Sequence, residues 1–271
     1  MLSIVIPVLN EVHTLPRVLV AVSKVLPGVA KEVLLVDDGS VDGTREWIRA
    51  QFPGAQRTLS RMDLDRDGNF VGGDEPAGTP GTPVTVRALF HERNKGKGAG
   101  LNTGLAAATG EVVVIQDADL EYDPADWDAM YELIAHRQVA DVVYGSRFMG
   151  RRLGRARFIS AQQVTANWVI STLFAVLYGK RLSDIEVCYK MFTREVKNTL
   201  AITCADFGCE VQISAQIVRP RRWRILEVPI GYRGRTAEEG KKIDWRDGLK
   251  ALGYLLRFRF DRLPAGAGPR A

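Results

Sequence analysis

Short runs of apolar, often β-branched residues alternate along the first half of the chain with segments whose apolar residues recur every three or four positions. The runs predict buried strands, and the periodic segments predict helices packed on a sheet. The predicted strands cover residues 2–8, 32–36, 84–90, 112–115 and 141–144. The predicted helices cover residues 14–26, 44–51 and 127–137, with another that ends near residue 108. This alternation indicates a mostly parallel sheet with right-handed crossovers, and therefore the α/β class.

The rhythm breaks at residues 61–83, which are rich in Gly, Pro and Asp. We expect a flexible insertion there that carries a β-hairpin of its own. The spacing of Asp63, Asp65 and Asp67 resembles a calcium loop. Because Asp74 stands where such a loop requires Glu, a calcium site is rejected.

Past residue 150 the pattern predicts helices at 158–178, 194–200, 207–218 and 245–260, and a strand within 224–232. The sequence shows no internal repeat and no sign of a second core. Residues 1–235 are therefore expected to form one domain. Residues 236–271 are expected to add a C-terminal amphipathic helix and a tail.

Three carboxylates follow the apolar run 112–115 at alternate positions: Asp117, Asp119 and Glu121. Ligands of open α/β sheets bind just past the carboxyl ends of parallel strands. Carboxylate oxygens there suit a hard divalent cation such as Mg²⁺ or Mn²⁺. The alternative is a polar loop that ends the strand and begins a helix at Asp123-Pro124. On this stretch alone both interpretations stay open.

Two other segments point to a phosphate-containing ligand. Glycines and lysines alternate from Lys95 to Gly98 at the start of a predicted helix, where backbone N–H groups can bind a phosphate. The segment is not a Walker A motif, because no Ser or Thr follows a Gly-Lys pair at the required place. Arg147 follows the strand 141–144 and is expected at the same sheet edge as the aspartates.

Positive charge gathers in two stretches, although the formal net charge of the chain is only +5. The clustered residues are Arg151, Arg152, Arg155 and Arg157 in one stretch and Arg219, Arg221, Arg222 and Arg224 in the other. Such clusters favour an anionic partner such as a phosphate or a lipid surface. Nucleic acid is not expected, because the arginines are not interleaved with aromatic residues that stack on bases.

The cysteines and the later apolar stretches bear on location. Cys188, Cys204 and Cys209 form neither a disulfide framework nor a metal-binding spacing, so a reducing, cytoplasmic setting is expected. Residues 164–178 contain Thr and Asn and are too short to span a bilayer. The sequence thus predicts no membrane crossing and leaves open whether the protein binds a membrane surface.

Six short motifs occur in an order that matches one known family. They are Pro7-Val8-Leu9-Asn10-Glu11, Val36-Asp37-Asp38-Gly39-Ser40, Asn94-Lys95-Gly96-Lys97-Gly98, Gln116-Asp117-Ala118-Asp119-Leu120-Glu121, Gly145-Ser146-Arg147-Phe148 and the segment 184–190. With these motifs at predicted strand ends, the chain resembles the family 2 glycosyltransferases of the GT-A fold. Within that family it looks like the polyprenyl-phosphate sugar synthases, which include the dolichol-phosphate mannose synthases. The resemblance implies a Rossmann-like central sheet flanked by helices.

The resemblance also implies a donor site. The residues that would form it are Pro7, Leu9, Glu11, Val36, Asp38, Lys97, Ala118, Arg235 and Lys241. Asp117 and Asp119 would be the metal-binding DXD pair of the family, with Glu121 as a third ligand of Mg²⁺ or Mn²⁺. Leu9 departs from the pattern, because mannose synthases usually carry Tyr there.

On the acceptor side, the resemblance implies that Arg147 faces the acceptor phosphate and that residues 158–178 lie on the membrane surface. The implied reaction is an inverting, metal-dependent transfer of a sugar from a UDP- or GDP-linked donor to a polyprenyl phosphate. It would occur at the inner face of the cytoplasmic membrane, with the protein bound peripherally. A homo-oligomer is compatible with the sequence.

Two alternatives stay open. A family 2 transferase with a soluble saccharide or another hydroxyl acceptor would need a carboxylate base, for which Asp184 or Glu186 could serve. A sugar-nucleotide sensor or membrane-recruited scaffold could use the same fold without catalysis, because a fold does not fix a function.

Overall fold

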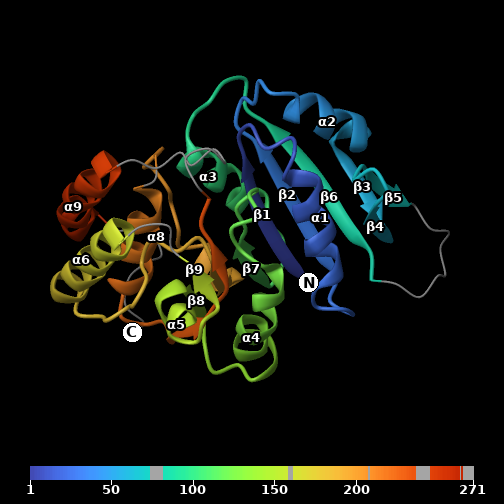
Figure 1. The fold of residues 1–271 in the computed structure, drawn as a ribbon. Coiled ribbons are helices and arrows are strands. Elements are labelled where there is room, and N and C mark those ends of the chain that lie inside the picture. Colours follow the sequence, from blue (N-terminus) through green and yellow to red (C-terminus); the bar gives the residue numbers. More distant parts are fainter. Residues whose placement is uncertain (74–81, 158–160, 207, 236–244, 263, 265–271) are drawn as a thin grey trace.

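An eight-stranded sheet forms the centre of the molecule (Figure 1). The structure is a computed structural model and describes residues 1–73, 82–157, 161–206, 208–235, 245–262 and 264. The strands lie in the order β11-β8-β10-β7-β1-β2-β6-β3. Their bounds are β1 Leu2–Val8, β2 Lys31–Asp37, β3 Gln56–Leu59, β6 Val84–Phe90, β7 Val112–Ile115, β8 Val142–Ser146, β10 Lys190–Thr193 and β11 Ile225–Pro229. The predicted α/β class is confirmed.

Helices cover the sheet and extend from one end of it (Figure 1). They are α1 Leu15–Lys24, α2 Thr44–Gln51, α3 Lys97–Ala107, α4 Trp127–Tyr131, α5 Arg147–Arg152, α6 Ala161–Tyr178, α7 Arg194–Lys197, α8 Cys209–Val218 and α9 Trp245–Phe260. The shorter pieces are the 3₁₀ turns η1 Pro53–Ala55 and η2 Pro124–Asp126, the π turn η3 Glu132–His136, and the strand pair β9 Ala156–Arg157 and β12 Tyr232–Arg233. The bounds predicted for β1, β6, β7, α2 and α9 match those of the structure.

Strand β10 was not predicted, and it changes the sheet next to the acidic strand end. It lies between β7 and β8 and runs antiparallel to both, with Met191 opposite Val114 on one side and Val143 on the other. Because it is antiparallel, its first residue, Lys190, lies at the edge where β7 and β8 end. The loop that precedes β10 is thereby brought to the carboxyl edge of the parallel strands.

The predicted hairpin in the insertion is confirmed. Strands β4 (Arg61–Leu64) and β5 (Phe70–Gly73) pair antiparallel, and residues 74–81 lie outside the described residues. The Asp65 carboxylate accepts hydrogen bonds from the backbone N–H groups of Asp67 and Asn69, at 2.9 and 2.8 Å. Asp65 therefore serves the turn of the hairpin.

Helices α6, α8 and α9 lie together at one end of the sheet (Figure 1). Phe174 was predicted on the exposed apolar face of α6, and that prediction is wrong: its side chain is fully buried and stacks on Tyr178, with 4.2 Å between ring centroids. Trp168 and Leu173 are exposed as predicted, and Leu177 is half-buried. Val176 is a further large apolar residue exposed on α6. Residues 158–160 of the predicted helix lie outside the described residues.

The described part of residues 236–271 is α9 and the few residues after it. Ala251, Leu255 and Phe258 of α9 are buried in the same hydrophobic core as the central sheet. Leu256 and Phe260 remain exposed at the other side of the helix. Helix α9 thus packs on the sheet-bearing part of the chain and leaves an apolar strip outside.

Candidate active site

The predicted carboxylates gather around one guanidinium at the carboxyl edge of the sheet. Arg235 Nη2 lies 2.9 Å from Asp119 Oδ2 and 3.2 Å from Glu11 Oε1. The backbone N–H of Arg235 donates to Glu121 Oε1 at 2.6 Å. Arg235 is thus the shared cationic partner of Glu11, Asp119 and Glu121. Glu11 precedes the other two carboxylates by more than 100 positions in the chain. Lys241, the other predicted basic residue of the donor site, lies outside the described residues.

This cluster holds more negative than positive charge. Burial raises the pKa of Asp119 to about 7, and the neighbouring charges of Asp117 and Glu121 act in the same direction against Arg235. An acid that holds its proton near neutral pH marks a place where a further cation would be stabilised. Together with oxygen-only donors, this fits a hard divalent metal ion.

The side chains alone would not enclose such an ion. Within the described ranges, no three Asp, Glu, His or Cys side chains converge as a complete metal-binding group. Glu121 also accepts a hydrogen bond from the Tyr232 hydroxyl at 3.1 Å. A metal held by Asp117 and Asp119 would therefore need oxygen ligands from a bound diphosphate, with Glu121 remaining a predicted ligand.

A chain of buried charges leads away from Asp117. Lys97 Nζ lies 2.8 Å from Asp117 Oδ1 and 3.0 Å from Glu210 Oε1, and Glu210 also pairs with the fully buried Lys190. Burial would lower the pKa of Lys97, but the attraction of Asp117 and Glu210 holds it well above its ordinary value. Lys97 is therefore a fixed cation beside the predicted metal ligands. Glu210, at the start of α8, had no signal in the sequence that linked it to the site.

The glycine-rich start of α3 packs closely against another part of the chain. The backbone N–H of Gly98 donates to the Ala205 carbonyl at 2.8 Å. A Cβ on Gly98 would lie 1.8 Å from the carbonyl oxygen of Cys204, so only Gly fits there. The bond to the Ala205 carbonyl occupies the Gly98 N–H, which is one of the backbone N–H groups that the sequence assigned to phosphate binding.

The predicted nucleotide-pocket residues lie at the ends of β1 and β2. Asp38 accepts hydrogen bonds from the backbone N–H groups of Lys95 and Gly96, at 2.9 and 2.7 Å, and contacts the ring of His91. Asp38 therefore holds the loop before α3 in place. Pro7 and Leu9 are half-buried at the site, whereas Val36 and Ala118 are buried.

Arg147 begins α5, which is capped by the Ser146 side chain. Its Nε and Nη2 donate to the two oxygens of Asp184 at 2.7 and 2.8 Å. The guanidinium also lies over the ring of Tyr232, 5.2 Å from its centroid. Since the Tyr232 hydroxyl reaches Glu121, Tyr232 joins the arginine to the carboxylate cluster. Sequence reasoning missed this tyrosine, because a lone Tyr at the end of a predicted strand carries no distinctive pattern.

The two predicted base candidates differ in their contacts. Asp184 has no exposed surface, and both of its oxygens accept hydrogen bonds. Glu186 is half-buried, and burial raises its pKa to about 7, partly offset by the charge of Arg147. Glu186 thus has the properties of a group that exchanges protons near neutral pH.

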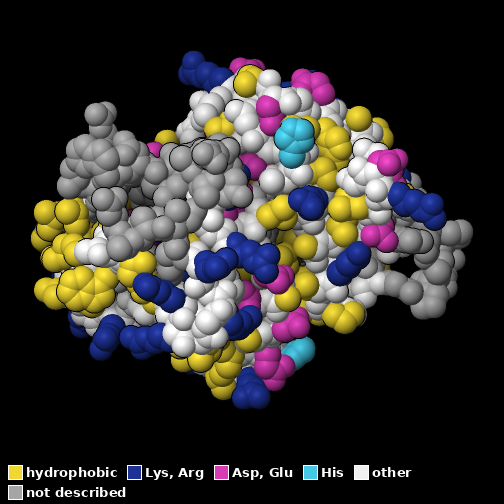
Figure 2. Space-filling model, viewed as in Figure 1, with side chains coloured by type: hydrophobic (Ala, Val, Ile, Leu, Met, Phe, Trp, Pro, Cys, Tyr) yellow, Lys and Arg dark blue, Asp and Glu magenta, His cyan; other side chains and the backbone are white. Residues whose placement is uncertain are grey.

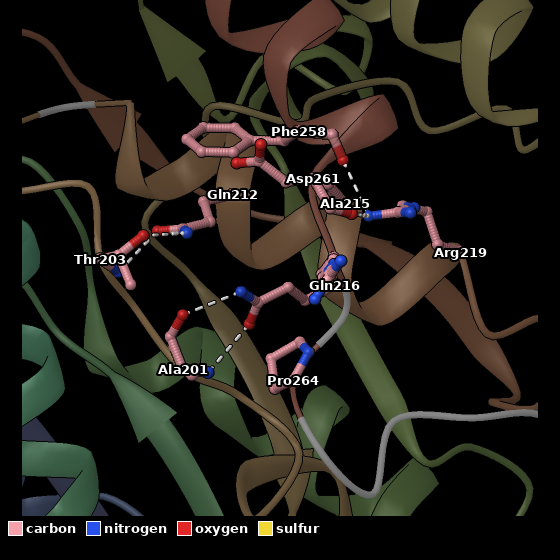
Figure 3. A pocket seen from close by; sticks show the side chains of 10 residues that line it. Ala201, Thr203, Gln212, Ala215, Gln216, Arg219, Phe258, Asp261 and Pro264 are labelled. Atoms are coloured by element: carbon pink, nitrogen blue, oxygen red, sulfur yellow. Dashed lines mark hydrogen bonds between the residues drawn. The ribbon is translucent and has the colours of Figure 1, made fainter.

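A separate cavity of about 280 Å³ lies between α8, the end of α9 and the loop before α8 (Figure 3). The amides of Gln212 and Gln216 bond to backbone groups of Thr203 and Ala201. The Arg219 guanidinium donates to carbonyl oxygens at the end of α9. These polar groups hold the loop and α9 to α8, and we assign no ligand to the cavity.

Comparison with known proteins agrees with this geometry. Residues 3–59 and 82–200 match the family described as glycosyl transferase family 2. The chain belongs to this family. The match is interrupted at the insertion that carries the β4–β5 hairpin. The matched part contains Asp117, Asp119 and Arg147. The predicted family is therefore confirmed.

Curated relatives of this chain are named as undecaprenyl-phosphate sugar transferases. The undecaprenyl-phosphate mannosyltransferase of Micrococcus luteus is 26% identical over 88% of this chain and 85% of its own length. The undecaprenyl-phosphate 4-deoxy-4-formamido-L-arabinose transferase of Aeromonas hydrophila is 27% identical over 89% of this chain. The chain spans only 62% of the length of that second relative.

Solved structures share the fold. Glucosyl-3-phosphoglycerate synthase from Mycobacterium tuberculosis, in complex with Mn²⁺, UDP and glucosyl-3-phosphoglycerate, superposes with a TM-score of 0.63. The match covers 95% of this chain and 79% of the other, at 19% identity. The predicted GT-A fold is confirmed by this similarity.

Proposed function

We propose that this family 2 protein transfers a sugar from a nucleoside-diphosphate donor to a polyprenyl phosphate. The observation that carries the proposal is a carboxylate cluster with more negative than positive charge, joined through Tyr232 to an arginine fixed by Asp184. The first part suits a metal-bound diphosphate, and the second suits an anionic acceptor. Curated relatives named for undecaprenyl phosphate support the choice of acceptor.

On the donor side, Asp117 and Asp119 would hold Mg²⁺ or Mn²⁺, which neutralises charge on the leaving diphosphate. Arg235 would exchange part of its contact with Glu11 and Asp119 for the diphosphate, with Lys241 as a second cation. Lys97 fixes the orientation of Asp117 through its contact at 2.8 Å. The donor would be a UDP- or GDP-linked sugar.

On the acceptor side, a phosphate monoester is already anionic, since its second pKa is about 6. It therefore needs cations that bring it to the anomeric carbon, and it needs no strong base. Arg147 supplies a guanidinium at the site, and Arg151 and Arg152 follow on the exposed last turn of α5. Direct attack by the phosphate oxygen would invert the anomeric carbon.

The experiment is a transfer assay with purified protein, Mn²⁺ and a short polyprenyl phosphate, run with UDP- and GDP-linked sugars in turn. We expect a lipid-linked sugar phosphate from one donor class. The matched control is the same polyprenol without its phosphate, which should accept no sugar. Transfer to the alcohol at an equal rate, or to no lipid at all, would refute the proposal.

A hydroxyl acceptor is the second candidate, and it is favoured by Glu186, whose pKa burial raises to about 7. A base acts in its deprotonated form, so a hydroxyl-acceptor enzyme would gain rate as the pH rises through about 7. For a phosphate acceptor, we expect Glu186→Gln to retain most of the turnover and to leave the pH profile unchanged. The control is Glu46→Gln, an exposed carboxylate on α2. Loss of both the turnover and the rise near neutral pH in Glu186→Gln would favour the hydroxyl acceptor.

We further propose that the protein binds peripherally to the inner face of the cytoplasmic membrane through α6 and α9. An apolar area covers this end of the molecule, with Lys and Arg side chains beside it (Figure 2). Trp168, Val176 and Phe260 are 63, 76 and 78% exposed there. None of the described helices is long and apolar enough to cross a membrane.

In liposome flotation, the protein is expected to rise with anionic vesicles at low salt and to bind less as salt is added. Trp168→Ala should weaken this binding, because the indole is an exposed apolar anchor on α6. The control is Val41→Ala, which removes an 87% exposed residue outside this area. Protein that stays at the bottom of the gradient would contradict membrane binding. A dimer that Trp168→Ala dissociates would instead make this face an oligomer contact.

A further inference from the structure

A buried chain of hydrogen bonds runs from helix α6 to Arg147. The amide of Asn167 donates to Asp184 Oδ1 at 2.7 Å, and the Ser171 hydroxyl donates to the Asn167 side-chain carbonyl at 3.1 Å. Asn167 and Ser171 are only 4 and 6% exposed. Two polar residues one turn apart on α6 are thus buried at the acceptor side of the site, where the proposed reaction does not use them.

Asp184 is the centre of this chain. Its Oδ2 accepts from the backbone N–H and the Nε of Arg147, at 3.1 and 2.7 Å. Its Oδ1 accepts from Arg147 Nη2 at 2.8 Å and from Asn167 at 2.7 Å. Four donors fix the plane of the carboxylate, and the paired bonds to Arg147 fix the plane of the guanidinium in turn. Asn167 is the one of these donors that comes from α6.

The opposite side of the same helix is the exposed apolar face. Trp168 follows Asn167 directly, and the Thr172 hydroxyl bonds to the Trp168 carbonyl at 2.7 Å on that outer side. Residues four apart share a face of a helix, whereas neighbours point about 100° apart. Helix α6 therefore carries Asn167 and Ser171 inward and Trp168 and Thr172 outward on one rigid element.

We propose that Asn167 is a positioning residue for the acceptor: through Asp184 it sets the orientation of the Arg147 guanidinium, so that recognition of the acceptor phosphate depends on the seating of α6. The inference rests on the proposed function, because it takes Arg147 as the residue that meets that phosphate. A phosphate needs the guanidinium edge in one orientation, whereas the metal and diphosphate side is held by other residues. Loss of Asn167 should therefore affect the acceptor and spare the donor.

The test compares separate KM values for donor and acceptor in Asn167→Ala, Ser171→Ala and the control Thr172→Val. Asn167→Ala removes one hydrogen bond to a charged group and is expected to raise the acceptor KM about tenfold. The donor KM and the affinity for Mn²⁺-UDP without acceptor should stay unchanged. Ser171→Ala keeps the bond from Asn167 to Asp184 and removes the contacts of the hydroxyl with Asn167 and with the Ile185 backbone N–H, so it should raise the acceptor KM by less. Thr172→Val removes an outward hydroxyl from the same helix and should alter neither value.

The outcomes separate the inference from the proposed function. Equal rises in both KM values with a lower thermal midpoint would reduce Asn167 to a structural residue and overturn the inference. An unchanged acceptor KM in Asn167→Ala, with active wild-type protein, would overturn it as well. A wild-type protein that transfers sugar to no polyprenyl phosphate would overturn the proposed function, and this inference with it. Because each variant is measured against that wild type, the two failures can be told apart.

Discussion

Asp119→Asn is expected to lower the turnover number by at least about a hundredfold, the effect of removing one electrostatic contact to a developing charge. The variant keeps the size of the side chain and removes its charge. Asp119 is the carboxylate whose pKa is raised to about 7 by burial, Asp117 and Glu121, so it is the acid that gains most from a bound cation. The Asn side chain would leave Arg235 paired with Glu11 and would weaken the binding of Mg²⁺ or Mn²⁺.

Turnover and direct Mn²⁺ binding in the presence of UDP are the measurements. The matched control is Asp128→Asn, an exposed acid on α4 that should behave as the wild type. Excess chelator should abolish the activity of the wild type, and added Mn²⁺ should restore it. Normal turnover in Asp119→Asn, or full activity in chelator, would contradict the metal site.

The second large effect concerns stability. Glu210→Gln is expected to lower the free energy of unfolding by about 3–5 kcal/mol, because it leaves a buried charge without its partner. The ammonium of Lys190 has no exposed surface and pairs with Glu210. Lys97 would keep its contact with Asp117, so the loss falls mainly on Lys190.

Urea unfolding at neutral pH measures the change. Adding Lys190→Met to Glu210→Gln removes the unpaired charge and should recover most of the lost stability. The control is Glu132→Gln, a half-exposed surface acid that pairs with His136 and Arg137 and should cost at most about 1 kcal/mol. A double variant as unstable as Glu210→Gln alone would show that the unpaired charge of Lys190 is not the cause.

Local sequence was enough to predict most of the sheet and the chemistry at its edge. Runs such as Val112–Ile115 are β-branched and buried on both faces, and helices between them require a parallel arrangement. The carboxyl ends of parallel strands meet at one edge, so the sequence predicted Asp117, Asp119 and Arg147 at the same edge. Glu11 was assigned to the site only through the resemblance to the family.

Helix α6 shows where local sequence was not sufficient. Apolar residues occur on most sides of this helix, so its pattern does not define which side meets the core. Packing against α9 decided the orientation, and it buried Phe174 and left Val176 exposed. In the same orientation of the helix, the Asn167 and Ser171 side chains point inward and are buried.

Pairing between distant segments was likewise decided only by the tertiary structure. Strand β10 inserts between β7 and β8 and brings Asp184, before it, to Arg147. Glu210 meets Lys97 across more than 100 positions of chain. The sequence determined which residue types stand at the strand ends, because periodicity and turn chemistry are local properties. Which charge pairs with which was set by the packing of the whole chain, because a buried ion is stable only where the fold delivers its partner.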